Sequence, residues 1–321
     1  MTDYTDFIPA GPQERNKQIQ YYEQTDFRDY GPTDPAFTNV GVVDSVTPTL
    51  NIARKVTRVV GSRHKYSERK LMQEGTVQMS YQLLDTVVPK YGIDNPAGTG
   101  TIAKPLSFLE SALINGTQAY RFYRDCVTET ISFALERDFM LTQNFYTSNI
   151  TDWMDITALR TALGLTGTDD PQFAGALSGE PWNHLDHEVT PPNTGSPLTI
   201  TAGSSDTFLY NSLNIEVNNN LRKLNPGGYD QTKYISAGNL VITGTFNTWL
   251  AEGTVMESHV RDFDNCTIAL KIKENTSNDV ILTLGGVKFN SFSDTVDSTA
   301  NEYSVIDYPF EASTISLTAY P

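Results

Sequence analysis

The feature that most constrains the fold is a strict alternation of apolar and polar residues in two distant segments. In GNLVITGTFNTWL, residues 238–250, the side chains of Leu240, Ile242 and Phe246 fall on one face of an extended chain. A similar segment, EGTVQMSYQLL, occupies residues 74–84. A period of two is typical of half-buried strands, so we expect a mainly β protein with a few short helices. The polar face of the first segment carries no charge, which is unusual for a surface in water.

The chain is strongly acidic, with 38 Asp and Glu residues against 23 Lys and Arg residues and a net charge of −15. This balance argues against a protein that grips nucleic acid tightly, because such binding requires a basic surface that displaces counterions from phosphates. It is typical either of a halophilic protein working in high salt or of an ordinary acidic soluble protein. Cys126 and Cys266 are too few for a disulfide framework, and we expect both to be buried free thiols.

The sequence shows neither a secretion signal at its start nor a membrane-spanning segment along its length. The first residues, MTDYTDFIPAGPQERNKQ, lack the basic start and the apolar stretch of a signal peptide. No apolar run approaches the roughly 18 residues needed to cross a bilayer. We therefore expect a protein without a membrane partner that is made and kept soluble in a cytoplasm.

Composition divides the chain into four segments. Residues 1–38 are rich in Tyr, Gln, Asp and Pro without periodicity, which predicts an N-terminal extended arm. Alternating segments predict a first domain over 39–150 and a second over 206–321. Residues 151–205 between them are interpreted as an insertion or linker that contains a short helix, capped by Thr151 or Asp152.

The two predicted domains resemble each other in the order of their elements. Aligning Gly75 with Gly238 superposes most of the apolar positions of the two alternating segments. The strand at 43–51 then matches 210–218, if the loop of the second half is four residues shorter. This order favours a duplicated domain, and the alternative is a single large β-sandwich whose strands merely look alike.

A helix and three further strands extend the match. Each half offers a helix after its alternating segment, at 83–94 and at 249–263, and the second has Thr254 as its expected cap. The strands that follow pair off as 106–114 with 266–274, 124–135 with 285–296, and 139–147 with 313–321.

Residues that could carry catalysis are sparse. HLDHE, residues 184–188, places His184 and His187 near two carboxylates, which is a possible zinc-binding composition. The order matches neither helical zinc motif, and its Pro- and Gly-rich surroundings favour a solvated loop. Motifs for a nucleophilic serine, a phosphate-binding loop or a dinucleotide-binding loop do not occur. We expect a protein that is not an enzyme and needs no metal or cofactor.

The order of elements resembles that of the tail tube proteins of long-tailed bacteriophages and tailed archaeal viruses. The segments that carry the resemblance are VDSVTPTLN, EGTVQMSYQLL and CVTETISFAL with their counterparts in the second half. The match covers roughly 39–150 and 206–321 and rests on patterns of small, polar and apolar residues.

Membership of this family would imply two tandem tail-tube-type β-barrel or β-sandwich domains whose strands join a ring-wide barrel. It would also imply a structural virion protein located in the tail, assembled in the host cytoplasm and acting in genome ejection. The implied partners are further copies of the chain in stacked rings, a tape-measure protein, tail terminator and baseplate proteins, and double-stranded DNA in passage. Two domains per chain predict rings of three chains, with six chains as the alternative. The segments 1–38 and 151–205 would act between rings or on the outside of the tube.

An uncharged polar face suits the wall of such a channel. Lysine or arginine would hold the phosphates of passing DNA, and a large apolar wall would hold an unfolded protein chain. The residues expected to face the lumen are Thr76, Gln78, Ser80, Gln82, Asn239, Val241, Thr243, Thr245 and Asn247. The alternative is that these side chains face bulk water on the outside of a sandwich.

Three other functions are compatible with parts of the sequence. A virion decoration or receptor-binding β-sandwich would have aromatic clusters on its loops and no need for open strand edges. A capsid or connector component would have a long helix, for which no segment is apparent. A secreted glycan hydrolase would need a signal peptide and a definable pair of catalytic carboxylates.

Overall fold

The computed structural model describes residues 18–25, 27, 35–58, 65–84, 86–93, 104–114, 116–136, 138–165, 171–175, 198–202, 204–208, 210–224, 234–273, 280–294 and 305–317. Its elements, in chain order, are β1 (Gln18–Glu23), β2 (Thr38–Asn39), β3 (Val42–Arg58), β4 (Lys65–Gln82), α1 (Val87–Ile93), β5 (Leu106–Ile114), β6 (Thr117–Leu135), β7 (Phe139–Thr147), β8 (Asn149–Ile150), α2 (Ile156–Leu163), β9 (Leu198–Ala202), β10 (Ser204–Phe208), β11 (Tyr210–Asn218), β12 (Arg222–Leu224), β13 (Tyr234–Ser236), β14 (Val241–Trp249), α3 (Leu250–Arg261), β15 (Cys266–Lys273), β16 (Val280–Phe289), β17 (Ser293–Asp294), β18 (Val305–Ala312) and β19 (Thr314–Leu317). The protein is mainly β with a few short helices, as predicted. None of the helices among the described residues is long and apolar enough to cross a membrane.

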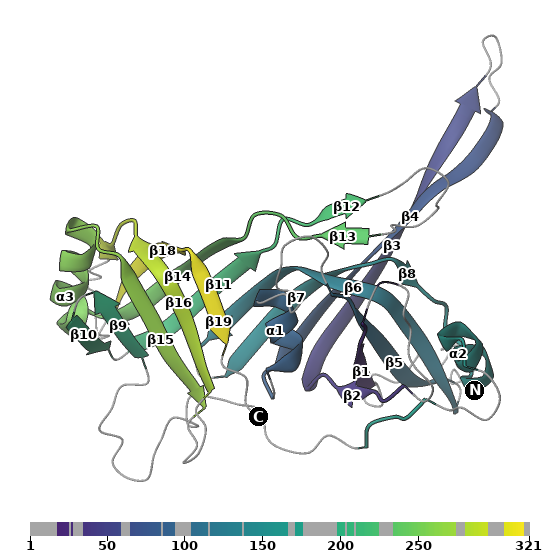
Figure 1. Ribbon diagram of the computed structural model, residues 1–321, viewed down its shortest axis with the longest axis horizontal. Coiled ribbons are helices and arrows are strands. Elements are labelled where there is room, and N and C mark those ends of the chain that lie inside the picture. Colours follow the sequence, from purple (N-terminus) through teal and green to yellow (C-terminus); the bar gives the residue numbers. More distant parts are fainter. Residues whose placement is uncertain are drawn as a thin grey trace, which may run out of the picture.

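The two halves of the chain repeat one antiparallel pairing scheme (Figure 1). In the first half the neighbours run β3–β4–β7–β6, and β5 and then β1 extend from the first part of β6. In the second half they run β11–β14–β18–β16, and β15 and then β9 extend from the first part of β16. A helix follows the second strand of each set directly along the chain, α1 after β4 and α3 after β14. The predicted duplication is therefore confirmed at the level of strand pairing.

The register of the two halves corrects the alignment made from the sequence. Val46 pairs with Met79 in the first half, and Leu213 pairs with Phe246 in the second. The same number of residues separates the partners in both pairs, so the second hairpin is not shorter. The match of 43–51 with 210–218 stands, but the counterpart of Gly75 is Ile242 and not Gly238. Alternation alone does not distinguish registers that differ by an even number of residues.

The last strand of each half also differs from the prediction. The counterpart of β7 is β18, because both pair with the second strand of their half. A serine follows each of them, and the chain then enters a short strand of the other sheet, β8 or β19. The N–H of Ser148 donates to the carbonyl of Arg124 at 3.0 Å, and the N–H of Ser313 donates to that of Gly285 at 2.9 Å. Strand β19, the described strand in the segment 313–321, therefore corresponds to β8 and not to the strand at 139–147.

The predicted domain limits are too narrow at the start of both halves. Within the predicted arm, strand β1 pairs with β5 over its whole length, and Ile19 and Tyr21 are buried in the core. Within the predicted insertion, β9 pairs with β15 and also with β10, which begins at the end of the insertion. The interpretation of β1 as part of an arm outside the domain is therefore wrong, and residues 1–17 lie outside the described part of the chain. The strand was not predicted because its sequence, QIQYYE, is largely polar, and only part of its surface is buried.

Helices form where the sequence predicted them, but their first residues differ. Helix α2 is capped by Asp155, whose Oδ1 accepts from the N–H of Ala158 at 2.7 Å, and not by Thr151 or Asp152. It ends at Gly164, whose φ of 74° is a left-handed conformation that suits glycine. Helix α3 starts at Leu250, so Thr254 lies inside it and is not its cap.

One hydrophobic core runs through both halves. Side chains from one face of the β3–β4–β7–β6 and β11–β14–β18 strands supply much of it, including Met79, Phe133 and Phe246, all at most 1% exposed. Helix α1 lies against β6 on this apolar side (Figure 1), where Val88 is buried. The opposite face of the same strands is left for polar residues.

The hairpins between the first two strands of each half end differently (Figure 1). Strands β3 and β4 stay paired as far as Arg58 and Lys65 and project beyond the rest of the molecule as a ribbon. In the second half, the pairing of β11 with β14 stops at Asn218, and a separate pair, β12–β13, folds against the first half. There Ile235 is buried in a cluster with Phe27, Val127 and Tyr146.

Gly244 leads to a prediction about the stability of the fold. A methyl group on its Cα would lie 2.4 Å from the carbonyl oxygen of Asn214 and 2.4 Å from Cζ of Phe310, which is 2% exposed. We expect Gly244→Ala to lower the free energy of unfolding by about 1–3 kcal/mol, the usual effect of overpacking. Urea unfolding measures it, with Gly175→Ala as the control, since nothing lies within 4 Å of a methyl group there. Equal midpoints for the two variants would contradict the packing described for Gly244.

Candidate functional site: the polar face of the continuous sheet

The polar residues singled out in the sequence share one face of one sheet. Thr76, Gln78, Ser80 and Gln82 of β4 alternate with buried residues, and so do Thr243, Thr245 and Asn247 of β14. Val241 is on the same face and is 48% exposed. Asn239 lies before the start of β14 and is exposed. Leu240, predicted for the apolar face, is 41% exposed because it also precedes the strand.

Direct cross-strand pairs connect the β4 residues to the β14 residues. Partners that lie opposite each other in neighbouring strands project to the same face. One such row crosses six strands and consists of Ser80, Thr142, Ser132, Glu216, Thr243 and Glu311. The two halves of the chain thus present a single polar surface.

Hydrogen bonds between neighbouring strands hold this surface in place. The hydroxyls of Ser80 and Thr142 are 2.8 Å apart, and Asn144 Nδ2 donates to Thr130 Oγ1 at 2.8 Å. Further along, Asn247 Nδ2 donates to Asp307 Oδ1 at 2.6 Å. Side chains that satisfy one another in this way offer few strong binding groups to a passing molecule.

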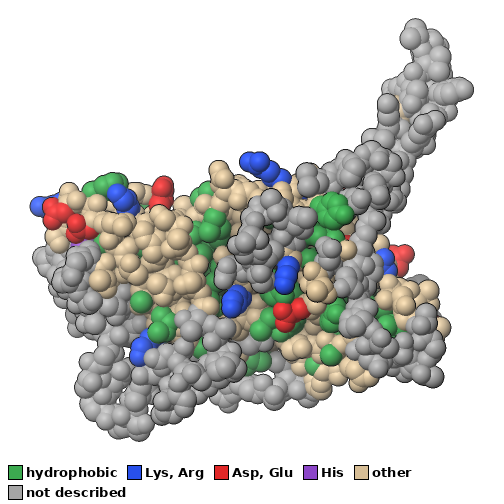
Figure 2. Space-filling view, in the orientation of Figure 1, with side chains coloured by type: hydrophobic (Ala, Val, Ile, Leu, Met, Phe, Trp, Pro, Cys, Tyr) green, Lys and Arg blue, Asp and Glu red, His purple; other side chains and the backbone are tan. Residues whose placement is uncertain are grey.

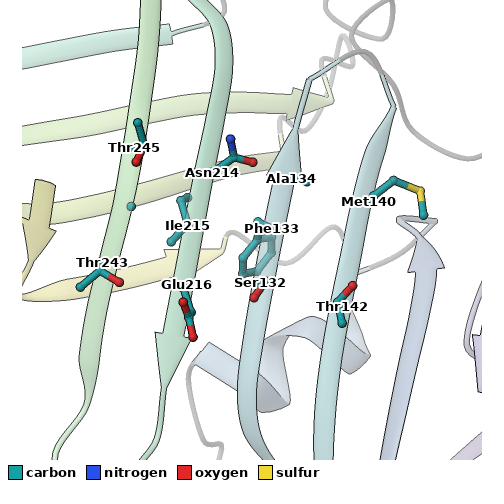
Figure 3. A pocket seen from close by; sticks show the side chains of 11 residues that line it. Ser132, Phe133, Ala134, Met140, Thr142, Asn214, Ile215, Glu216, Thr243 and Thr245 are labelled. Atoms are coloured by element: carbon teal, nitrogen blue, oxygen red, sulfur yellow. The ribbon is translucent and has the colours of Figure 1, made fainter. Parts of the chain in front are cut away.

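A hollow of about 440 Å³ lies on this face where the two halves meet (Figure 3). Strands β7, β6, β11 and β14 contribute its lining, in which small and hydroxyl side chains such as Ser132, Thr142, Thr243 and Thr245 predominate. Glu216 is the charged residue in the lining. The hollow therefore has little to hold a specific ligand and no group to attract an anion.

The charges on the described part of this face are mainly negative. Glu216, Asp307 and Glu311 are exposed, and Lys288 lies opposite Glu311 in the β16–β18 pair. Figure 2 shows the side of the molecule on which α1 lies and not the polar face, and there too the described charged side chains are scattered among uncharged polar and backbone atoms. A polyanion would meet weak repulsion on the polar face and no cluster of cations.

Comparison with known proteins adds a weak structural likeness, which carries no argument about fold or function. No protein-family model matches this chain, and no curated protein matches its sequence. A chain of the sixfold-symmetrised cryo-EM structure of the anti-feeding prophage baseplate is similar to this chain with a TM-score of 0.33 and 7% sequence identity. The alignment covers 41% of this chain and 98% of that one. A likeness at this level says nothing about what the chain does.

The junction between the halves joins two copies of one unit edge to edge. Strand β6 of the first half pairs with β11 of the second through six residue pairs, from Leu135 with Leu213 to Thr130 with Asn218. On the apolar side of this junction, Ile131 and Val217 lie opposite each other, and both are 0% exposed. Two units of this fold can therefore continue one sheet without a gap.

The two outer edges of the same sheet carry exposed apolar side chains. Leu50 and Ile52 of the edge strand β3 are 40% and 41% exposed, and Phe292, which directly precedes β17, is 38% exposed. Sequence analysis missed these residues, although Leu50 and Ile52 continue the alternation of β3. That alternation assigns a face to each side chain but does not show which strands lie at the edge of a sheet.

The β3–β4 ribbon is a second feature that sequence analysis missed. Its backbone register pairs residues of like charge, namely Arg54 with Lys70, Lys55 with Arg69 and Arg58 with Lys65. Seven of the 23 Lys and Arg residues fall within 54–70, with one acidic residue among them. Counting charge in a short window would have found this segment, since the chain as a whole is acidic.

Both cysteines are free and buried, as expected. Burial raises the pKa of the Cys126 thiol, and burial with the nearby Asp264 carboxylate raises the pKa of Cys266 to about 11. Neither thiol is therefore expected to react in the folded protein near neutral pH. The segment HLDHE at 184–188 lies outside the described residues.

Proposed function

We propose that this chain is a structural virion protein of the tail-tube type, which assembles into rings that stack into a conduit for the viral genome. The observation that carries the proposal is the β6–β11 junction. Two copies of one unit already continue a single sheet within the chain, while β3 at one end and β17 at the other remain unpaired on their outer sides among the described residues. An edge of this kind invites pairing with another chain.

Repeating the junction from chain to chain would close the sheet into a barrel. Each chain supplies two units of four strands, so three chains would supply about 24 strands, and barrels of 16–18 strands already enclose water-filled channels. A wall closed in this way has no free edge left. The proposal therefore includes rings of three chains, and six chains remain the alternative.

The polar face would line the channel in this assembly. Cross-bonded side chains such as Ser80 with Thr142, and exposed carboxylates such as Glu216, would let DNA pass with little attraction. No catalytic step is needed, so the proposed role is not enzymatic. Its partners would be the tape-measure protein, the tail terminator and baseplate proteins, and the DNA in transit.

The alternative role as a decoration or receptor-binding sandwich makes no use of open edges. Exposed Leu50, Ile52 and Phe292 along the two edges favour the tube over that role.

Electron microscopy of the purified protein tests the proposal. We expect rings or tubes with a central hole, and a three-dimensional reconstruction with three chains per ring in which six similar units surround the bore. Six chains per ring would contradict the stoichiometry. Compact particles without a hole, at every protein and salt concentration tried, would contradict the function itself.

A further inference from the structure

The internal junction gives a template for how two copies of this chain meet. Strand β17 continues the line of β16 along β18, and its pairs Ser293 with Asp307 and Asp294 with Ile306 repeat two pairs of the first half. Those are Ser132 with Thr142 and Phe133 with Leu141. The segment 291–294 is thus the counterpart of 130–133, the part of β6 that pairs with β11.

The other side of the template is supplied by β3. Because Val46 corresponds to Leu213, the counterparts of Glu216, Val217 and Asn218 in β11 are Thr49, Leu50 and Asn51. Val217 is 0% exposed at the internal junction, whereas Leu50 is 40% exposed at the outer edge. Ile131 is likewise 0% exposed, whereas its counterpart Phe292 is 38% exposed.

We infer that the outer edge of 291–294 pairs antiparallel with β3 of a second copy of this chain, in the register of the β6–β11 junction. Ser291 would then lie opposite Asn51, Phe292 opposite Leu50, and Ser293 opposite Thr49. The two exposed apolar side chains would cover each other, as Ile131 and Val217 do inside the chain. This inference rests on the edge-to-edge assembly proposed above and adds its partner strand and register.

Pro48 fits this register and explains how the free edge is kept from pairing at random. Its counterpart, Ile215, turns its N–H toward β6, because the N–H of Asn219 donates to the carbonyl of Glu129 at 2.9 Å and amide directions alternate along a strand. Pro48 therefore has no donor on the outer side, where proline is tolerated in edge strands. The joint between chains has one hydrogen bond fewer than the internal junction.

Paired cysteines test the register. Thr49 and Ser293 take the positions of Glu216 and Ser132, a pair whose amides point away from each other and whose Cβ atoms therefore come close. We expect Thr49→Cys with Ser293→Cys to form disulfides between chains upon mild oxidation, giving covalent dimers and closed trimers on a non-reducing gel. Thr47→Cys with Ser291→Cys is the matched control on the same two strands. Its residues would be four positions out of register, about 13 Å apart, and should not link.

The outcomes separate the register from the proposed function. Rings in the microscope without a Thr49–Ser293 link would overturn the register and leave the tube standing. Equal amounts of disulfide in the test pair and the control pair would also overturn the register. So would the absence of the disulfide from both the assembled and the unassembled protein. The buried native cysteines, Cys126 and Cys266, should form no disulfide in any of these variants.

A second variant tests the apolar contact without relying on oxidation. Phe292→Asp is expected to raise the protein concentration needed for ring formation on the order of 30-fold or more, as loss of a central apolar contact does. The monomer should keep its melting temperature, because Phe292 is already 38% exposed. Ile131→Asp, at the equivalent internal position, should instead unfold the chain. Undiminished assembly of a folded Phe292→Asp protein would overturn the inference.

Discussion

Lysine at both Gln78 and Thr243 is expected to leave the tube intact and to slow the passage of DNA through it. Gln78 is exposed and Thr243 half-buried, both on the polar face, so neither change removes core packing. Exposed substitutions usually alter stability by about 0.5 kcal/mol or less. Repeated in every ring, the two lysines would place circles of positive charge along the bore. Each phosphate contact releases counterions, so the delay should be large at low salt and much smaller at high salt.

Genome release from assembled virions at two ionic strengths measures this effect. Ser258→Lys with Ser316→Lys is the charge-matched control, because both residues are exposed and lie outside the polar face, in α3 and β19. Normal tails with unchanged release at both salt concentrations would show that β4 and β14 do not line the channel. Aggregation of the subunits would show that the face is buried in the assembly.

Deletion of residues 2–24 is expected to destabilise or unfold the monomer, whereas deletion of residues 2–15 should not. The longer deletion removes β1, whose Ile19 and Tyr21 are buried, and each such side chain contributes about 1.5–3 kcal/mol by burial. It also removes Gln24, which donates to Asp125 Oδ1 at 3.0 Å and accepts from Ser107 at 2.8 Å. Leaving buried polar partners unsatisfied adds to the loss. Total stabilities of about 5–15 kcal/mol leave little margin for such a change.

Thermal unfolding followed by circular dichroism compares the two truncated proteins with the full chain. A melting temperature for the 2–24 deletion close to that of the full chain would show that β1 is dispensable. In that case residues 18–24 would belong to an arm outside the domain.

Strands with a full apolar stripe were the part of the fold that could be predicted from sequence. The bounds of β5, β7 and β11 agree with the predicted 106–114, 139–147 and 210–218. Strands β7 and β11 alternate between core and surface over most of their length, whereas β5 is buried over most of its length. Strand β18 was not predicted, since Pro309 interrupts its pattern and proline argues against a central strand. Pairing partners and sheet edges could not be derived either, because alternation records which face a residue takes and not which strand lies beside it.

The candidate site also has one part that could be predicted from the sequence and one part that could not. Its polar face followed from the period of two in 74–84 and 238–250, and the structure brings both segments to one surface. Its extent across six strands depends on the β6–β11 pairing, for which no local signal exists. Phe292 lies within the predicted strand 285–296, but nothing in that segment indicates that it is at the edge of a sheet.

The unequal hairpins give the proposed ring a different symmetry at its rim from that of its bore. The polar rows of both halves follow the same register, so six nearly equivalent units would surround the lumen. The β12–β13 hairpin is already folded against its own chain, through Ile235 and through Lys223, whose Nζ lies 3.5 Å from Glu74 Oε2. Of these two strand pairs, only the β3–β4 ribbon projects, so a ring of three chains would carry three ribbons at alternate units. A protein that binds the end of the tube would therefore meet three projecting ribbons, related by threefold symmetry, around a channel whose symmetry is close to sixfold.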